Sequence, residues 1–268
     1  MTANNRTVAI TGASGGIGLA AARMFRDRGD VVYCLSRTDP NEESVYHISV
    51  DVTDEAGVAA AFAQIAAERG GLDVLVSNAG MGVSGAAEFT SLEDARRQLD
   101  VNFFGFHTCV RNAVPLMRGR GGTIIATSSV AAVFAIPFQA FYSASKAAVN
   151  MLALALANEL APFGIRVCAL MPGDVKTGFT NARVKQHGGA EHYGNAVEAS
   201  VTVMENDERG GMAPEVIAKR IVALSLKKNP KPLSSVGLQY KFFCFLGKAL
   251  PIRLQNWLVG KLYIKQSK

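Results

Sequence analysis

The sequence has few of the residues that would build a disulfide-stabilised or metal-binding protein. Its four cysteines, at positions 34, 109, 168 and 244, match no metal-binding spacing. We therefore expect reduced, buried thiols in a cytoplasmic protein. His187 and His192 have no convergent partners in the sequence around them, so no metal site is predicted.

Long uncharged apolar runs are also missing. No segment reaches the ~18 apolar residues that a membrane-spanning helix needs, and no basic, apolar leader opens the sequence. We expect a protein that is neither secreted nor membrane-spanning. A hydrophobic content of 49% with 19% charged residues is typical of an ordered globular domain with a substantial core.

Acidic residues stop at Glu215. The 53 residues that follow contain 11 Lys or Arg, so this segment at +11 leaves −5 for the preceding 215 residues of a chain at +6. The basic character of the chain therefore belongs to its C-terminal part.

This basic part contains two helix candidates. Residues 238–250 form an apolar, aromatic pattern that stops before Pro251, and 252–264 form a second one. Three interpretations are open: a helical cap on the sheet or across a subunit boundary, a lid over a lipophilic pocket, or peripheral contact with an anionic membrane. Basic and apolar residues alternate here, so nucleic acid is not expected as a partner. The apolar stripe of the second helix is Leu254, Trp257, Leu258 and Leu262.

A glycine-rich turn near the start of the chain indicates a dinucleotide site. The β-branched run 6–11 leads into Gly-Ala-Ser-Gly-Gly-Ile-Gly at 12–18, and a helical pattern follows. In a strand, glycine turn and helix, backbone N–H groups can bind a pyrophosphate at the helix N-terminus.

The next strand ends without the acidic residue that binds the ribose of NAD. Ser36 and Arg37 stand there instead, and a hydroxyl with a guanidinium suits a 2′-phosphate. NADP(H) is predicted as the preferred cofactor, with NAD(H) as the alternative.

Tyr142 and Lys146 lie four residues apart in a helical stretch, so they share one helical face. A neighbouring cation favours a phenolate and lowers the pKa of a tyrosine. A shift of about 3 units needs roughly 4 kcal/mol, which a lysine and a second positive charge, such as an oxidised nicotinamide, could supply. The pair predicts a general acid/base for alcohol and ketone chemistry.

Alternating patterns along the chain predict a doubly wound α/β fold with a parallel sheet, because the strand candidates are continuous apolar runs. The expected helices are 54–69, 91–118, 140–161 and 214–227. The expected strands are 45–50, 73–77, 122–127, 165–171 and 232–236.

Over roughly 6–230 the chain resembles the short-chain dehydrogenase/reductase family. Ser129 lies 13 residues before Tyr142, as the catalytic serine of that family does. The resemblance implies a Rossmann-type catalytic domain over 1–237 and a helical extension over 238–268. The cofactor-binding residues that it implies are Thr11, Gly12, Ser14, Gly16, Ile17, Gly18, Ser36, Arg37, Asp51, Val52, Asn78, Ala79, Gly80, Tyr142, Lys146, Pro172, Gly173, Val175 and Thr177.

The resemblance also implies four catalytic roles. Tyr142 would exchange a proton with the substrate oxygen, and Lys146 would lower the pKa of Tyr142 and hold the ribose hydroxyls. Ser129 would bond the carbonyl oxygen. Asn102 would position a water molecule that connects Lys146 with solvent.

Substrate residues are expected where the family varies, at 130–139 and at 178–213. Within the second region, the stretch 187–194 is loop-like and expected to be mobile. Members acting on hydroxysteroids, bile acids or retinoids imply a lipophilic alcohol or ketone as the substrate. A 3-oxoacyl-thioester reductase or broad carbonyl reductase is the alternative, with a non-catalytic NADP-binding regulator behind it. A homodimer or homotetramer through helices near 91–118 and 140–161 is implied as well. The predicted substrate contacts are Ser129, Phe134, Phe138, Gln139 and Tyr142.

Overall fold

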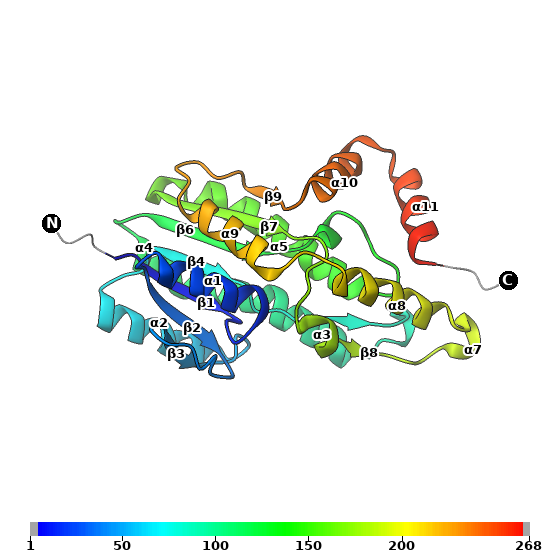
Figure 1. Cartoon of the computed structure of the whole chain (residues 1–268), viewed down its shortest axis with the longest axis horizontal. Helices are drawn as coiled ribbons and strands as arrows, with labels where there is room; N and C mark the ends of the chain where they lie inside the picture. The colour runs from blue at the N-terminus through cyan, green and yellow to red at the C-terminus, as the bar shows by residue number, and fades with distance from the viewer. Residues whose placement is uncertain (1–4, 265–268) are drawn as a thin grey trace.

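The computed structural model describes residues 5–264. A seven-stranded, all-parallel sheet forms its centre, in the order β3-β2-β1-β4-β6-β7-β9 (Figure 1). The predicted α/β fold is confirmed, and the expected strands agree with the observed ones within two residues. The strands are β1 (Thr7–Thr11), β2 (Val31–Ser36), β3 (Tyr46–Ser49), β4 (Val74–Ser77), β6 (Gly122–Thr127), β7 (Ile165–Met171) and β9 (Leu233–Ser235).

Helices cover both faces of this sheet. Successive side chains of a strand point to opposite faces, so Ala9 packs in one core cluster while Val8 and Ile10 pack in the other. This explains why the strands are apolar throughout. One cluster contains α2 (Glu55–Arg69), α4 (Gly105–Met117) and α5 (Ala140–Glu159), and the other contains α1 (Gly16–Asp27) and α9 (Pro214–Ser225).

The order in which the chain adds strands to the sheet reverses between β1 and β4. β2 and β3 lie on one side of β1, and β4, β6, β7 and β9 lie on the other. Parallel α/β sheets bind ligands at such a switch point, outside the carboxyl ends of the strands. The segments after Thr11 and Ser77 therefore define the place for a site.

The predicted helix 91–118 consists of three pieces. α3 (Leu92–Leu99) and α4 are joined by the π-helical turn η2 (Asp100–Phe104). π-turns occur often at functional sites, and Asn102 lies inside this one.

The segment 178–213 forms helices and a short strand. It contains α6 (Phe179–Ala182), β8 (Val184–Lys185), α7 (Ala190–Tyr193) and α8 (Ala196–Arg209). β8 pairs with β5 (Val83–Ser84), and the Tyr193 hydroxyl donates a hydrogen bond to Glu88 at 2.7 Å. These short elements tie the segment to the chain beyond β4, and the mobility of the stretch 187–194 stays a prediction. The remaining short helices are η1 (Ala87–Phe89), η3 (Val130–Ala132) and η4 (Ala161–Phe163).

All four cysteines are buried and free, as predicted. Among the described helices, α5 alone is long and apolar enough to cross a membrane by length and composition. It packs on β7 and α3 and buries Lys146 and Asn150, which is the pattern of a core helix.

The C-terminal part forms α10 (Leu238–Ala249) and α11 (Ile252–Tyr263), separated at Pro251 as predicted. Both project from the body beyond β9 (Figure 1). The predicted stripe of α11 does not pack on the sheet: its four side chains are 40–64% exposed. Gln255 and Val259 are the buried residues of α11 instead. The interpretation that this apolar stripe caps the sheet is therefore wrong.

Candidate active site

One cavity of about 1420 Å³ runs from the glycine turn to α10 and α11. It lies outside the carboxyl ends of β1, β4, β6 and β7, where the switch point predicts a ligand. Most of the predicted cofactor residues line it: Gly12, Ser14, Gly16, Ile17, Ser36, Arg37, Asp51, Val52, Asn78, Ala79, Gly80, Tyr142, Lys146, Pro172, Gly173, Val175 and Thr177.

The glycine turn has the backbone that a pyrophosphate requires. Gly12 and Gly16 have φ of +64° and +52°, the left-handed region that favours glycine. Gly15 has extended backbone and open space where its Cβ would be, and it lines the cavity. The free N–H groups of α1 begin here, so the residues present fit a dinucleotide cofactor.

Two predicted cofactor residues, Thr11 and Gly18, lie behind the turn and do not line the cavity. The Thr11 hydroxyl accepts hydrogen bonds from the backbone N–H groups of Asn78 and Ala79, at 2.9 and 3.0 Å. A Cβ on Gly18 would lie 2.4 Å from the Gly12 carbonyl oxygen. The motif requires these residues because they hold β1, β4 and α1 together, and not because they touch a ligand.

The end of β2 carries the predicted 2′-phosphate contacts. Arg37 is largely exposed and lies 3.8 Å from Asp51, a weak surface pair that leaves the guanidinium available. The Ser36 hydroxyl donates to the Thr38 carbonyl at 2.9 Å. Its proton is therefore engaged, and Arg37 is the better placed of the two to bind an anion.

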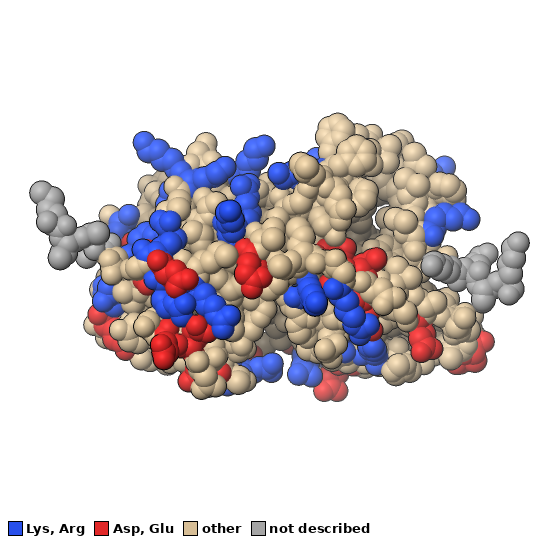
Figure 2. All heavy atoms as spheres, in the orientation of Figure 1, with Lys and Arg blue, Asp and Glu red and all other residues tan. Residues whose placement is uncertain are grey.

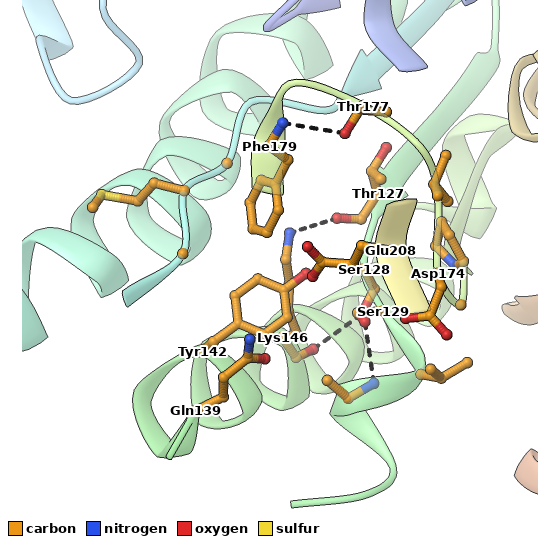
Figure 3. Close-up of a pocket in the computed structure, with 18 of the residues that line it drawn as sticks. Thr127, Ser128, Ser129, Gln139, Tyr142, Lys146, Asp174, Thr177, Phe179 and Glu208 are labelled. Carbon is orange, nitrogen blue, oxygen red and sulfur yellow. Dashed lines mark hydrogen bonds between the residues drawn. The ribbon is translucent and has the colours of Figure 1, made fainter. Parts of the chain in front are cut away.

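Tyr142, Lys146 and Ser129 meet at the centre of the cavity (Figure 3). Tyr142 and Lys146 lie on the first turns of α5, and Ser129 follows β6. The Lys146 ammonium is buried, donates a hydrogen bond to the Thr127 carbonyl at 2.8 Å, and lies 5.8 Å from the centre of the Tyr142 ring. The sequence-predicted trio is thus brought together.

The pKa values of Tyr142 and Lys146 reflect their burial. Burial raises the pKa of Tyr142 to about 12, and a side-chain hydrogen bond with Ser129 offsets only part of this. Burial also lowers the pKa of Lys146 to about 8. For the protein groups by themselves desolvation dominates the pKa of Tyr142. The expected lowering requires a second positive charge, such as an oxidised nicotinamide, beside Lys146 and stays a prediction.

Asn102 lies at the edge of this trio and does not line the cavity. Its side chain accepts from the backbone N–H of Met81 at 2.8 Å and donates to the Met81 carbonyl at 3.1 Å and to Ser145 at 3.0 Å. These bonds join the segment after β4 to α5, and the Ser145 hydroxyl in turn donates to the Tyr142 carbonyl at 2.8 Å. The contacts of Asn102 in this structure are positioning contacts.

Of the predicted substrate residues, Phe134 and Gln139 line the cavity and Phe138 does not. Phe138 has φ of +60°, unusual for a bulky residue, and its ring packs edge-on against Tyr193 at 5.7 Å. Phe138 was therefore a wrong prediction, because this turn of the backbone directs the ring elsewhere.

Sequence reasoning missed an acidic group in the cavity wall. Asp174 follows β7, whereas Asp207 and Glu208 lie on α8; Asp174 and Glu208 appear beside Ser129 and Tyr142 in Figure 3. Burial, with the charge of Asp174, raises the pKa of Asp207. Glu208 is neutralised by the buried Arg183. Within residues 5–264, Asp174 and Asp207 have no cationic partner.

The C-terminal helices reach this group. The Tyr240 hydroxyl of α10 donates to the Asp174 carboxylate at 2.7 Å. A Cβ on Gly173 would lie 2.1 Å from the Tyr240 ring, so Gly173 makes room for α10. The only sequence signals were the glycine itself and the unassigned Asp174 beside it.

The chain is similar to known proteins over nearly its whole length. The short chain dehydrogenase family profile matches residues 6–188. A 3-ketodihydrosphingosine reductase of Bacteroides thetaiotaomicron is 41% identical over 86% of this chain and 87% of the relative. A 3beta-hydroxysteroid dehydrogenase of Eggerthella lenta is 38% identical over 64% of this chain and 71% of the relative.

A solved structure has the same fold. The crystal structure of a short-chain dehydrogenase from Streptomyces avermitilis, 28% identical, superposes with a TM-score of 0.84 and covers 98% of both chains. Together with the family match, this shows that the chain belongs to the short-chain dehydrogenase family and is an NAD(P)-dependent oxidoreductase acting on alcohols and ketones.

Proposed function

We propose that this enzyme uses NADPH to reduce the ketone of a long-chain substrate that carries an amino group beside the carbonyl, as 3-ketodihydrosphingosine does. The observation that carries the proposal is the composition of this cavity. Its lining combines Tyr142 and Ser129 with aromatic and aliphatic residues of α10 and α11 and with the carboxylates of Asp174 and Asp207. The 41% identical relative, named for that reduction, supports it.

The reaction converts a ketone, NADPH and a proton to an alcohol and NADP⁺. When bound, the cofactor supplies a hydride to the carbonyl carbon. Tyr142 donates its phenolic proton to the carbonyl oxygen, and Ser129 donates a hydrogen bond to that oxygen as negative charge develops. A phenol whose pKa burial raises to about 12 retains its proton at neutral pH, which favours the reductive direction. Lys146 holds the ribose hydroxyls beside the phenol.

The preference for NADPH rests on Arg37. Its guanidinium lines the nucleotide end of the cavity and has only a long, exposed pairing with Asp51. A 2′-phosphate offers a stronger, charge-assisted partner than that carboxylate.

The preference for an amine rests on charge. Asp174 acts electrostatically on the Tyr142 phenol, whereas the charge of Glu208 is compensated by Arg183. An ammonium one carbon from the reacting ketone would therefore lie within reach of the Asp174 charge. Burial and the charge of Asp174 raise the pKa of Asp207. A nearby cation would stabilise the ionised form of this carboxylate. A bile-acid carboxylate would be repelled by the same residues.

A hydroxysteroid is the second candidate. The relative from Eggerthella lenta favours it, and the apolar wall over α10 and α11 would accept a fused-ring ketone as well as an alkyl chain. The two substrates differ in charge, since a steroid ketone has no amino group for Asp174 and Asp207 to bind.

NADPH consumption separates these candidates. The assay compares 3-ketodihydrosphingosine, its N-acetyl derivative and a steroid ketone. We expect the free amine to give the highest kcat/KM, and N-acetylation to lower it at least tenfold (about 1.4 kcal/mol) because the amide is uncharged.

The combined variant Asp174→Asn/Asp207→Asn should reduce kcat/KM for the amine and leave that for the N-acetyl derivative nearly unchanged. Asp27→Asn, an exposed acid on α1, is the matched control and should change neither. Equal rates for the amine and the amide would contradict the amine preference, and turnover of the steroid ketone alone would favour the second candidate.

A further inference from the structure

We infer that α10 and α11 dock on an anionic lipid surface and place the mouth of the substrate cavity against it. The outer faces of the two helices carry this inference, whichever ketone the enzyme reduces.

Exposed apolar side chains concentrate on these helices. Of the eighteen large hydrophobic residues that are exposed within residues 5–264, ten lie between 238 and 264. Large exposed apolar residues concentrated on one pair of helices indicate an interaction site. The ten are Leu238, Phe242, Phe243, Phe245, Ile252, Leu254, Trp257, Leu258, Leu262 and Ile264.

The two helices have an inner and an outer face. The inner face lines the cavity and includes Tyr240, Phe243, Trp257, Leu258, Lys261 and Leu262. Phe242 and Phe245 do not line it and are 57% and 65% exposed. A lid that served only the substrate would need no aromatic residues on the outside.

Hydrogen bonds hold the corner between α10 and α11, so the outer face of the two helices has a defined shape. Gln255 donates from its amide to the carbonyls of Gly247 and Leu250, at 3.0 and 2.7 Å. Gly247 packs closely on Val133 and Phe134, and Tyr240 holds α10 to Asp174. The projecting pair thus keeps its shape while its outer side chains face solvent.

The charge of the patch selects the partner. Within 238–264 there are four basic residues and no acidic one. Figure 2 shows this region as a mostly tan projection with blue at its edges. Aromatic and aliphatic residues flanked by Lys and Arg are the composition of helices that lie in the interface of an anionic membrane. The four basic residues are Lys241, Lys248, Arg253 and Lys261.

A second copy of the chain fits this face less well. A two-fold dimer places the same patch on itself, so four cations would face four cations without an acidic residue between them. Anionic headgroups instead attract each Lys and Arg near the surface by about 1 kcal/mol, while the rings enter the acyl boundary. In this docked orientation the cavity would open toward the bilayer, in which a long-chain substrate dissolves.

Trp257 tests whether the cavity side of α11 meets the lipid, because it is the only tryptophan of the chain, lines the cavity and is 58% exposed. Its emission is recorded with the full-length protein and vesicles of mixed phosphatidylglycerol and phosphatidylcholine. We expect a blue shift and co-sedimentation with these vesicles. Binding should be at least tenfold weaker to phosphatidylcholine alone, and added salt should weaken it.

Two variants separate the apolar and the electrostatic contributions to vesicle binding. Phe242→Ser/Phe245→Ser removes outer aromatic surface, and Lys241→Glu/Lys248→Glu/Arg253→Glu reverses the charge. Each should lower vesicle partitioning at least tenfold while the thermal midpoint and NADPH affinity stay close to wild type, because these residues lie outside the cavity. Leu92→Ser/Val216→Ser, exposed apolar residues of α3 and α9, is the matched control and should bind vesicles normally.

Absence of a spectral shift with anionic vesicles would overturn the inference. So would equal partitioning of the wild type and the charge-reversed variant. A blue shift that appears without lipid as protein concentration rises, together with dimers in sedimentation, would show that a second copy covers this face and would also overturn it.

Discussion

The nucleotide half and the substrate half of the cavity are built in opposite ways. The nucleotide half consists of backbone and small residues: glycines with positive φ, the buried Thr11 hydroxyl, and strand ends at the switch point. The substrate half includes side chains from α8, α10 and α11, and the last two helices leave large apolar residues exposed. Backbone geometry therefore shapes the nucleotide half, the cofactor cradle, whereas side chains from separate elements shape the substrate half.

The largest expected effect lies where the two halves meet. Tyr142→Phe removes the proton donor while the cradle stays intact, so kcat should fall by about 10²–10⁴. The NADPH dissociation constant, measured by fluorescence titration, should change less than threefold. Retention of more than a few per cent of the rate would contradict the role of this residue.

Lys146 carries a pH-dependent cost in the nucleotide half. Below pH 8 the Lys146 ammonium is charged in both the folded and unfolded states. Its desolvation in the folded state then lowers the unfolding free energy by the full amount. As pH rises from about 8 to 10.5 the folded state loses its proton first, so stability rises. The shift corresponds to an upper limit of about 3 kcal/mol.

Lys146→Met should lack this rise. The measurement is the difference in unfolding free energy between wild type and variant, from urea titrations across that pH range, because other groups titrate in both. The exposed Lys228→Met is the control and should follow wild type. Parallel pH curves for wild type and Lys146→Met would show that this ammonium is not desolvated.

Two glycine variants separate folding from cofactor binding within the cradle. In Gly18→Ala the new Cβ would lie 2.4 Å from a backbone oxygen, so we expect a loss of about 1–3 kcal/mol in unfolding free energy. In Gly15→Ala the Cβ meets open space, so stability should change by less than about 0.5 kcal/mol. NADPH affinity should nevertheless fall, since a pyrophosphate approaches that backbone. Unchanged affinity in Gly15→Ala would argue against this position for the phosphates.

The smallest effect concerns the adenosine end. Arg37→Asp should raise the KM for NADPH roughly tenfold, the scale of one lost charge-assisted hydrogen bond, and change the KM for NADH much less. Arg96→Asp, an exposed residue of α3 with the same charge change, should alter neither. Equal losses for both cofactors would remove the preference for NADPH.

The sequence predicted the cradle well, because its chemistry requires particular residue types at short spacing. Gly12, Gly16 and the Tyr142–Lys146 pair are local patterns on one turn or one helix face, and the structure brings them together. Thr11 and Gly18 were recognised for the same reason, although their function is to hold strands and helix together rather than to touch the ligand.

The acidic wall could not be predicted in this way. Asp174, Asp207 and Tyr240 come from the end of β7, from α8 and from α10, and only tertiary packing brings them together. Phe138 failed for a different reason: a positive φ at a phenylalanine has no sequence signal. The desolvation that raises the pKa of Tyr142 could not be predicted either, because the sequence shows which charges are near but not how strongly burial desolvates the phenol.

The central claim is that the cavity under α10 and α11 holds the alkyl chain of a ketone whose carbonyl meets Tyr142. The most direct test is kcat/KM with NADPH for a series of 2-amino-3-ketones of increasing chain length. Each added methylene that enters the apolar wall should raise kcat/KM by about fourfold, the equivalent of about 0.8 kcal/mol, until the cavity is filled. A value that is independent of chain length, or that falls as the chain grows, would contradict the account.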